Sequence, residues 1–336
     1  MNAQKKYRII MVAGMLALAA SCAIALTMGQ FHIAFTDVMQ ELFFGGTGVK
    51  NIHTVLFQVR IPRIILSCLA GAGLAASGVA FQSIFANPMA SSDTLGTANG
   101  ASFGAALAIL LGLDSFGVQL MALACGMLAI ALVFLSSSGM DHRGRKDMVM
   151  VILAGMVISS LFSALVSLVK YVADPQDQLP AITFWLMGSF STATRNGVAL
   201  GAPLMVAGMI VLHMIRYRLN ALSLSEDEAK SLGVNLPLTR WLAIGSASAI
   251  TASVVSMCGV IGWVGLLVPH IARMLTGNDA RRLMPVSMVF GALFMVATDT
   301  VARCMIASEI PVSILTAVIG APLFIVLLRR TGGMQA

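Results

Sequence analysis

A compact polar segment, Ser225-Glu-Asp-Glu-Ala-Lys-Ser-Leu-Gly233, interrupts an otherwise apolar part of the chain. The Ser225 hydroxyl can accept a hydrogen bond from the N–H of Glu228, whose carboxylate can accept one from the N–H of Ser225. Glu226 and Asp227 fall in the first turn, where the helix dipole favours anions, and Gly233 supplies a left-handed stop. The segment predicts a surface helix of about two turns, too short to be stable alone. We expect it to receive mechanical work from a partner.

Motifs for nucleotide binding or for zinc proteolysis do not occur in the sequence. There is no Gly-Lys pair and hence no P-loop, and there is no HExxH. Few ionisable residues lie deep in an apolar segment, whereas an ion-driven carrier needs a carboxylate near the middle of the membrane. Asp299 and Arg303 are four residues apart near the end of one such segment, where a mutual ion pair is the simpler explanation. The sequence predicts a transport pathway, not an enzyme, with no catalytic residue, metal site or cofactor of its own.

The composition is that of a polytopic membrane protein. Hydrophobic residues make up 58% of the chain and charged residues 10%, against about 25% charged in soluble domains. The mean hydropathy is +0.91. At about 20 residues per span plus loops, 336 residues allow roughly ten crossings and no separate soluble domain. The scattered basic residues carry no aromatic-interleaved stripe, so nucleic acid is not an expected partner.

Runs without charge predict where the helices cross the lipid bilayer. The run from Trp241 to Pro269 is too long for one span and too short for two, so we expect a full helix and then a short one broken near Gly259, Gly262 and Gly265. The ten expected helices lie near 9–28, 62–84, 93–112, 117–137, 148–171, 198–215, 239–258, 260–276, 284–303 and 311–328.

Most of the 21 lysines and arginines fall on one side of this arrangement. The positive-inside rule makes that side cytoplasmic. It contains the amino terminus, the carboxyl terminus and the polar helix at about 225–233.

Several segments, taken in order along the chain, resemble one family of permeases. These segments are Arg60-Ile-Pro-Arg-Ile64, Gln82-Ser-Ile-Phe-Ala-Asn-Pro-Met-Ala90, Asn99-Gly-Ala-Ser102, Trp185-Leu-Met-Gly-Ser189, Leu219 to Gly233, Gly262-Trp-Val-Gly-Leu-Leu-Val-Pro-His-Ile-Ala-Arg273 and Ile319-Gly-Ala-Pro322. They resemble the FecCD-like permeases, the membrane subunits of ATP-driven importers for iron-siderophore complexes, haem and vitamin B12. One departure is Gly259-Val-Ile-Gly-Trp263, where the family usually has Gly-Pro-Ile-Gly-Phe.

The resemblance implies an all-α fold of about ten transmembrane helices with type II ABC importer architecture, in which residues 1–336 form one transmembrane domain. It implies a homodimer in the lipid bilayer, two cytoplasmic ATP-binding subunits that carry ATP and Mg, and an external or periplasmic substrate-binding protein. The polar helix would couple to the ATPase. The residues implied in coupling are Ser225, Glu226, Asp227, Glu228, Ala229, Leu232 and Gly233.

Other site residues also follow from the resemblance. Arg60, Arg63 and Arg303 match arginines that dock the binding protein, although a position at the membrane interface would also explain Arg60 and Arg63. A cytoplasmic gate is implied at Asn87, Pro88 and Met89, where Asn-Pro also suits a plain turn. The implied pathway lining is Ser159, Ser160, Ser163 and Ser167, whose hydroxyls could instead bond to carbonyls of their own helix.

The sequence therefore predicts the permease subunit of a binding-protein-dependent ABC importer in a bacterial or archaeal cytoplasmic (inner) membrane. The cargo expected first is a ferric siderophore, with haem, cobalamin or a molybdate-type oxyanion as alternatives. An ion-coupled secondary transporter, dependent on Asp93 or Asp299, is the alternative from another class. A membrane-embedded enzyme would need a polar catalytic cluster that the sequence does not contain.

Overall fold

The structure is a computed structural model that describes residues 3–44, 46, 49–91, 95–137, 148–224, 226–306 and 308–332. Every regular element in these residues is helical. The elements are α1 (Ala3–Thr27), α2 (Phe35–Phe43), α3 (Lys50–Thr54), the π-helical η1 (Val55–Arg60), α4 (Ile61–Ile84), α5 (Thr97–Leu110), α6 (Ser115–Ser136), α7 (Met148–Val172), α8 (Gln178–Leu186), α9 (Arg195–Leu219), the 3₁₀ turn η3 (Asn220–Ser223), α10 (Glu226–Ser231), α11 (Leu236–Cys258), α12 (Val264–Thr276), α13 (Ala280–Met305) and α14 (Val312–Gly332).

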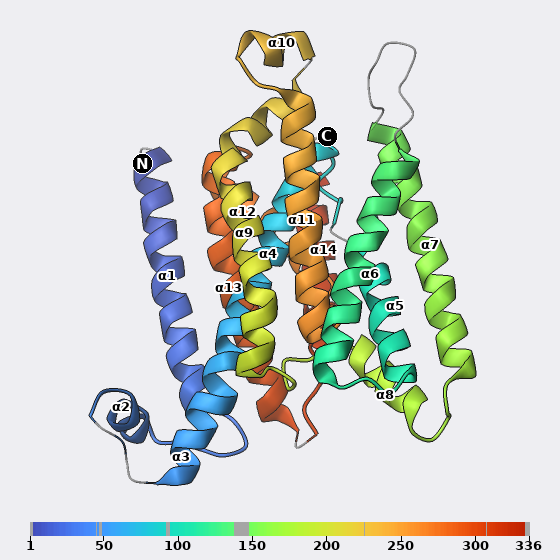
Figure 1. Ribbon diagram of the computed structural model, residues 1–336. Coiled ribbons are helices and arrows are strands. Elements are labelled where there is room, and N and C mark those ends of the chain that lie inside the picture. The colour runs from blue at the N-terminus through green and yellow to red at the C-terminus, as the bar shows by residue number, and fades with distance from the viewer. Residues whose placement is uncertain are drawn as a thin grey trace.

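The long helices stand side by side as one bundle (Figure 1). Seven helical segments in the described part of the chain are long and apolar enough to cross a membrane, and α5, α12 and α14 are shorter apolar helices. Each of the ten expected ranges overlaps one of these segments. The all-helical, multi-pass prediction is confirmed.

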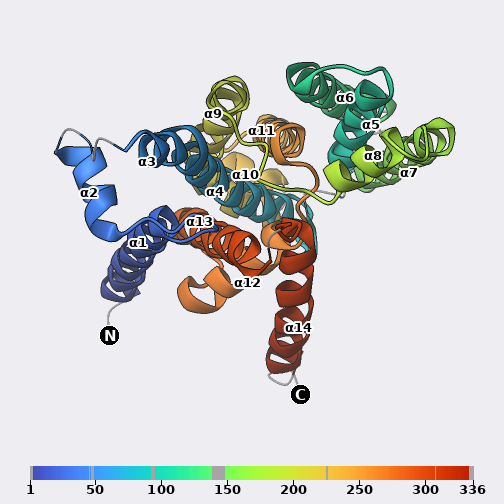
Figure 2. The same ribbon diagram turned by 90° about the horizontal axis from the view of Figure 1, so that it is seen from below.

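The bundle has a packed centre and looser flanks. In Figure 2, α4 and α11 lie near the middle, α1 lies on one flank, and α5, α6, α7 and α8 form a group on another. The apolar spans of α4 and α11 are each 78% buried, against 11% for α1 and 17% for α7. The outer helices therefore leave wide apolar faces for lipid or for another chain.

Glycines let the central helices touch backbone to backbone. A Cβ added at Gly71 of α4 would lie 2.2 Å from the carbonyl oxygen of Gly291 of α13. A Cβ at Gly78 would lie 1.9 Å from the carbonyl oxygen of Gly265 of α12. Without a hydrophobic driving force in lipid, such close approach is a main source of helix association.

The glycine-rich break after α11 lies where the sequence predicts it. The helix ends at Cys258, and Gly259 follows with φ +70°, a conformation that suits glycine. The chain then turns at Trp263, with φ +72°, into the short α12. The prediction of one full and one short helix is confirmed.

One span begins earlier than expected, and two short helices lie outside the expected spans. The second span begins near Lys50, not at residue 62, because α3 and η1 continue into α4. The helices α2 and α8, the latter beginning at Gln178, are short helices that the span prediction did not include. Both α2 and α8 are too short to span a bilayer.

Candidate functional site

The polar helix α10 projects beyond the ends of the long helices, at the end of the bundle where α1 begins (Figure 1). It joins the α9–η3 segment to α11. Ala229 is fully buried against the bundle, whereas Glu228 is exposed and Leu232 is 66% exposed. Ser225, the predicted cap, lies outside the described residues. Among the side chains that the structure describes in this segment, the alanine is thus buried, and the glutamate and the leucine just after the helix are exposed.

The end of α10 has the form that the sequence predicts. Gly233 has φ +71°, in the left-handed region that disfavours side chains with a Cβ. The N–H of Val234 donates to the carbonyl oxygen of Ala229 at 2.9 Å, as in a Schellman end. No atom lies within 4 Å of the place where a Cβ of Gly233 would be. The backbone conformation, not lack of space, is what calls for glycine here.

Polar contacts tie the two connections of α10 to the bundle. The Asn220 side chain donates from Nδ2 to Asp279 Oδ1 at 2.8 Å and accepts from the N–H of Ala280 at 2.8 Å, which joins the end of α9 to the start of α13. On the other side, Asn235 caps α11 by accepting from the N–H of Leu238 at 3.0 Å. These contacts join the segment before α10 to the start of α13 and cap the start of α11.

At the opposite end of the bundle, three arginines that the resemblance assigns to docking are buried in the single chain. Arg60, Arg63 and Arg303 are 3%, 5% and 5% exposed. Arg60 donates to the carbonyl oxygens of Leu26 and Phe31. Arg303 donates to the carbonyl oxygen of Ala25. These bonds fix the last turns of α1 and the connection after it against η1 and α13.

The acidic partners of this cluster are Asp299 and Glu309. Arg63 donates to Asp299 through Nε at 3.0 Å and Nη2 at 2.8 Å, and to Glu309 through Nη1 at 3.0 Å. The Asp299–Arg303 pair expected from the sequence is present at 4.0 Å, so Arg63 is the closer partner. Sequence reasoning missed Glu309, whose partner lies 246 residues away along the chain.

The predicted gate residues form an exposed turn after α4. Asn87 Oδ1 accepts from the N–H of Met89 at 2.9 Å, and the Asn87 carbonyl oxygen accepts from the N–H of Ala90 at 3.1 Å. Asn87, Pro88 and Met89 are all exposed in the single chain. The turn geometry agrees with the plain-turn reading and leaves the side chains accessible.

The four serines of α7 divide into one packed residue and three exposed ones. Ser159 accepts at its hydroxyl from Asn99 Nδ2 at 2.7 Å, which holds α7 against the start of α5. Ser160, Ser163 and Ser167 are exposed, and the hydroxyls of Ser160 and Ser167 donate to carbonyls of their own helix. The face remains mildly polar without a fixed charge.

Comparison with known proteins identifies the class. The family model of the FecCD transport family matches residues 17–330, so the chain belongs to that family. It is 42% identical to the molybdate import system permease protein MolB of Haemophilus influenzae, over 95% of this chain and 96% of that protein. It is 36% identical to the Fe(3+) dicitrate transport system permease protein FecD of Escherichia coli K12, over 94% of this chain and 96% of that protein.

A solved structure agrees with this family assignment. The chain superposes on a metal-chelate type ABC transporter in an inward-facing conformation with a TM-score of 0.87 and 40% identity. The match covers 96% of this chain and 99% of that one. The chain is therefore an ABC importer permease of the FecCD family with several membrane spans.

Proposed function

We propose that the chain forms half of a homodimeric translocation pathway, driven by two cytoplasmic ATP-binding subunits and supplied by an external or periplasmic binding protein. The observation that carries this proposal is α10, which projects from the bundle with Leu232 exposed and is tied through Asn220 to α13. Residues 225–233 act as the coupling helix. ATP and Mg bind to the partner ATPase.

Closure of the ATPase dimer would displace α10 and the helices joined to it. An exposed leucine on a short helix suits insertion into an apolar cleft, the usual mode of helix-in-groove recognition. The displacement then passes to α9 and α11, because Asn220 and Asn235 fix both connections. The α10 end of the bundle is cytoplasmic in this mechanism, and so are the terminus before α1 and the end of α14.

The exposed hydroxyls of α7 suit a pathway wall. Ser160, Ser163 and Ser167 lie on a helix whose span is only 17% buried in the single chain, so a second copy can complete the wall. Mildly polar, uncharged walls release a ligand more readily than they hold it. The exposed turn at 87–89 closes this pathway toward the cytoplasm.

The arginine cluster at the other end supports docking of the binding protein. The cluster has three positive charges, from Arg60, Arg63 and Arg303, and two negative charges, from Asp299 and Glu309. The Glu309 side chain is 27% exposed, so a carboxylate of the binding protein can compete with it for Arg63.

The cargo that we propose first is a molybdate-type oxyanion. The chain shares 42% identity with a molybdate permease and 36% with an iron dicitrate permease over similar coverage. This difference in identity is our reason for proposing an oxyanion ahead of the ferric siderophore expected from the sequence. The ferric chelate stays as the second candidate because of that 36% relative and the match to a metal-chelate type transporter.

Reconstitution tests the proposal. The chain, its ATPase and its binding protein are placed in vesicles, and uptake of radiolabelled molybdate and of a radiolabelled ferric siderophore is measured with and without ATP. We expect ATP-dependent molybdate uptake. ATP-dependent uptake of the siderophore alone would overturn the oxyanion assignment. Uptake that needs an ion gradient and no ATPase would overturn the importer mechanism.

A further inference from the structure

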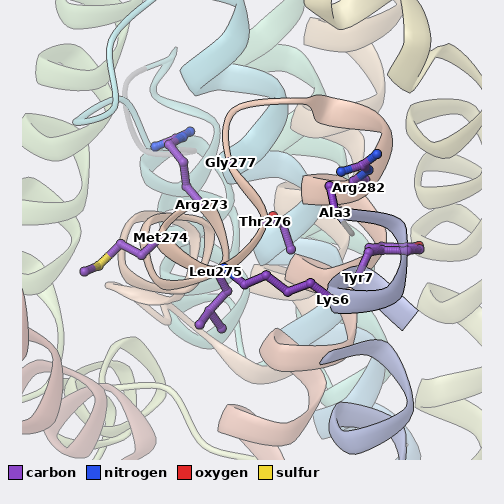
Figure 3. Close-up of a pocket in the computed structure, with 9 residues that line it drawn as sticks. All are labelled: Ala3, Lys6, Tyr7, Arg273, Met274, Leu275, Thr276, Gly277 and Arg282. Carbon is purple, nitrogen blue, oxygen red and sulfur yellow. The ribbon is translucent and has the colours of Figure 1, made fainter. Parts of the chain in front are cut away.

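A cavity of about 270 Å³ lies between the start of α1, the last turn of α12 and the first turn of α13 (Figure 3). It lies at the α10 end of the bundle, away from the serines of α7 and from the arginine cluster. Its lining residues are Ala3, Lys6, Tyr7, Arg273, Met274, Leu275, Thr276, Gly277 and Arg282.

The lining is strongly basic. Lys6, Arg273 and Arg282 contribute three positive charges, and none of the nine lining residues is acidic. In Figure 3, Lys6 extends from α1 toward the part of α12 that carries Leu275, and Arg282 comes from α13 close to Ala3. Neither Lys6 nor Arg282 forms an ion pair within the part of the chain that the structure describes. Their charges are available to a ligand.

The third cation is held by the protein itself. Arg273 Nη2 donates to Gln82 Oε1 at 2.6 Å, so this guanidinium points toward α4 and away from the other two cations. Its Nη1 is buried and has no hydrogen-bond partner in the described residues. The Arg273 guanidinium thus adds positive potential to the cavity from the side of α4, although it does not point at a ligand there.

The helix dipoles and the nearest acid do not cancel this charge. Arg282 lies in the first turn of α13, where the positive end of the helix dipole makes a cation unfavourable. Asp279, the acid nearest in sequence, already accepts from Asn220 Nδ2 and from the N–H of Arg281. An anion in the cavity would relieve the repulsion between the cations.

The surroundings of the cavity are those of a membrane surface. Lys6 lies in the first turn of the apolar α1, whose next turns expose Ile9 and Val12 by 50% and 52%. Tyr7 lines the cavity, and aromatic rings of this kind concentrate at the level of the lipid headgroups. Met274 of α12 is 45% exposed beside it. Acyl chains can therefore lie along α1 while a headgroup enters the cavity.

We propose that this cavity binds the phosphate group of an anionic phospholipid, with Lys6 and Arg282 as its ligands and Arg273 as the background charge. Phosphate accepts several charge-assisted hydrogen bonds from such cations. Basic pockets between membrane helices on the cytoplasmic side are suited to anionic headgroups. The site is separate from the coupling helix and does not depend on the identity of the cargo.

Native mass spectrometry of the full chain in nanodiscs tests the proposal. The discs contain phosphatidylcholine with a minor fraction of phosphatidylglycerol, and the retained phosphatidylglycerol is counted. The test variant is K6Q/R282Q. The matched control is K5Q/R281Q, which removes the same charge from the same two helix ends outside the cavity lining. We expect roughly 30-fold weaker retention in K6Q/R282Q and near wild-type retention in the control.

Two results would overturn the proposal, and one further variant guards against misfolding. Equal loss of lipid in both double variants would show a diffuse surface attraction in place of a site. A second contrary result has two parts. Inorganic phosphate stabilises the wild type, but not K6Q/R282Q, against heat in pure phosphatidylcholine discs, and the wild type retains no phosphatidylglycerol in the mixed discs. That result would assign the cavity to a free anion. K6R/R282K keeps both charges and should retain the lipid as the wild type does.

Discussion

At the end opposite α10, Arg63 and Asp299 are buried and joined to each other, whereas at the α10 end Lys6 and Arg282 have no ion pair among the described residues. Asp299 is 2% exposed, and its closer partner, Arg63, comes from another helix. Leu232, which directly follows α10, is 66% exposed. The charged side chains at the arginine end are thus paired with each other, whereas Lys6, Arg282 and Leu232 at the α10 end lack such partners among the described residues.

The difference follows from the cost of burying a charge. Removing one member of a buried pair leaves the other desolvated and alone, which costs about 3–5 kcal/mol. Exposed charges cost little because water and salt screen them. We conclude that the buried ion pairs at the arginine end stabilise the bundle, whereas the exposed side chains at the α10 end add little to its stability.

Asp299→Asn should give the largest loss of stability. The change keeps the shape of the side chain but leaves Arg63 and Arg303 without their shared carboxylate, so we expect a loss of about 3–5 kcal/mol. Denaturant unfolding of the purified protein measures it. The control Asp177→Asn removes an exposed carboxylate and should change stability by less than about 0.5 kcal/mol. Equal stability of both variants would contradict the view that the buried Asp299 stabilises the bundle more than an exposed carboxylate does.

Glu309→Gln should have a smaller effect at the same end. The Glu309 side chain is 27% exposed, so its bond to Arg63 is partly screened by solvent. We expect a loss of about 1 kcal/mol or less, because Asp299 still neutralises Arg63. The same unfolding assay applies. A loss as large as that of Asp299→Asn would mean that the two acids act as one buried unit.

Gly233→Val should leave the bundle intact and disturb only α10. A residue with a Cβ at φ +71° costs about 1–2 kcal/mol, and the strain is local to the helix end. We expect an unchanged Tm of the bundle, with ATP-driven uptake lost in vesicles. Gly245→Val is the matched control, because a Cβ there also meets no atom within 4 Å and the backbone is ordinary helix. Normal uptake by Gly233→Val would contradict the proposal that α10 couples the chain to the ATPase.

The sequence predicted what depends on local pattern. Runs of apolar residues located the seven long apolar helices and the three shorter ones that the structure describes. Gly233 and Gly259 marked the ends of α10 and α11, because left-handed backbone has a strong local preference for glycine. The start of the second span was wrong by a dozen residues. Arg60 and Arg63 suggested the end of a membrane segment, since an isolated charge in lipid is costly.

Long-range partners explain that error. Arg60 donates to carbonyl oxygens of the end of α1 and of the connection after it, and Arg63 is paired with Asp299 and Glu309, more than 230 residues away along the chain. No window of sequence contains both members of these pairs. The basic cavity was missed for the same reason, since Lys6 and Arg282 meet only when α1 and α13 pack together.

Leu232→Asp should have the smallest effect on stability and the sharpest effect on assembly. The side chain is 66% exposed, so the folded chain loses little and the change in stability should stay within about 0.5 kcal/mol. Binding of the ATPase subunits should weaken about tenfold or more, because a carboxylate would have to enter an apolar cleft. Co-purification of the ATPase with the detergent-solubilised chain measures it. Leu113→Asp, at an exposed leucine of the other end, should bind the ATPase normally. Equal binding of the ATPase by both variants would mean that Leu232 does not contact the ATPase.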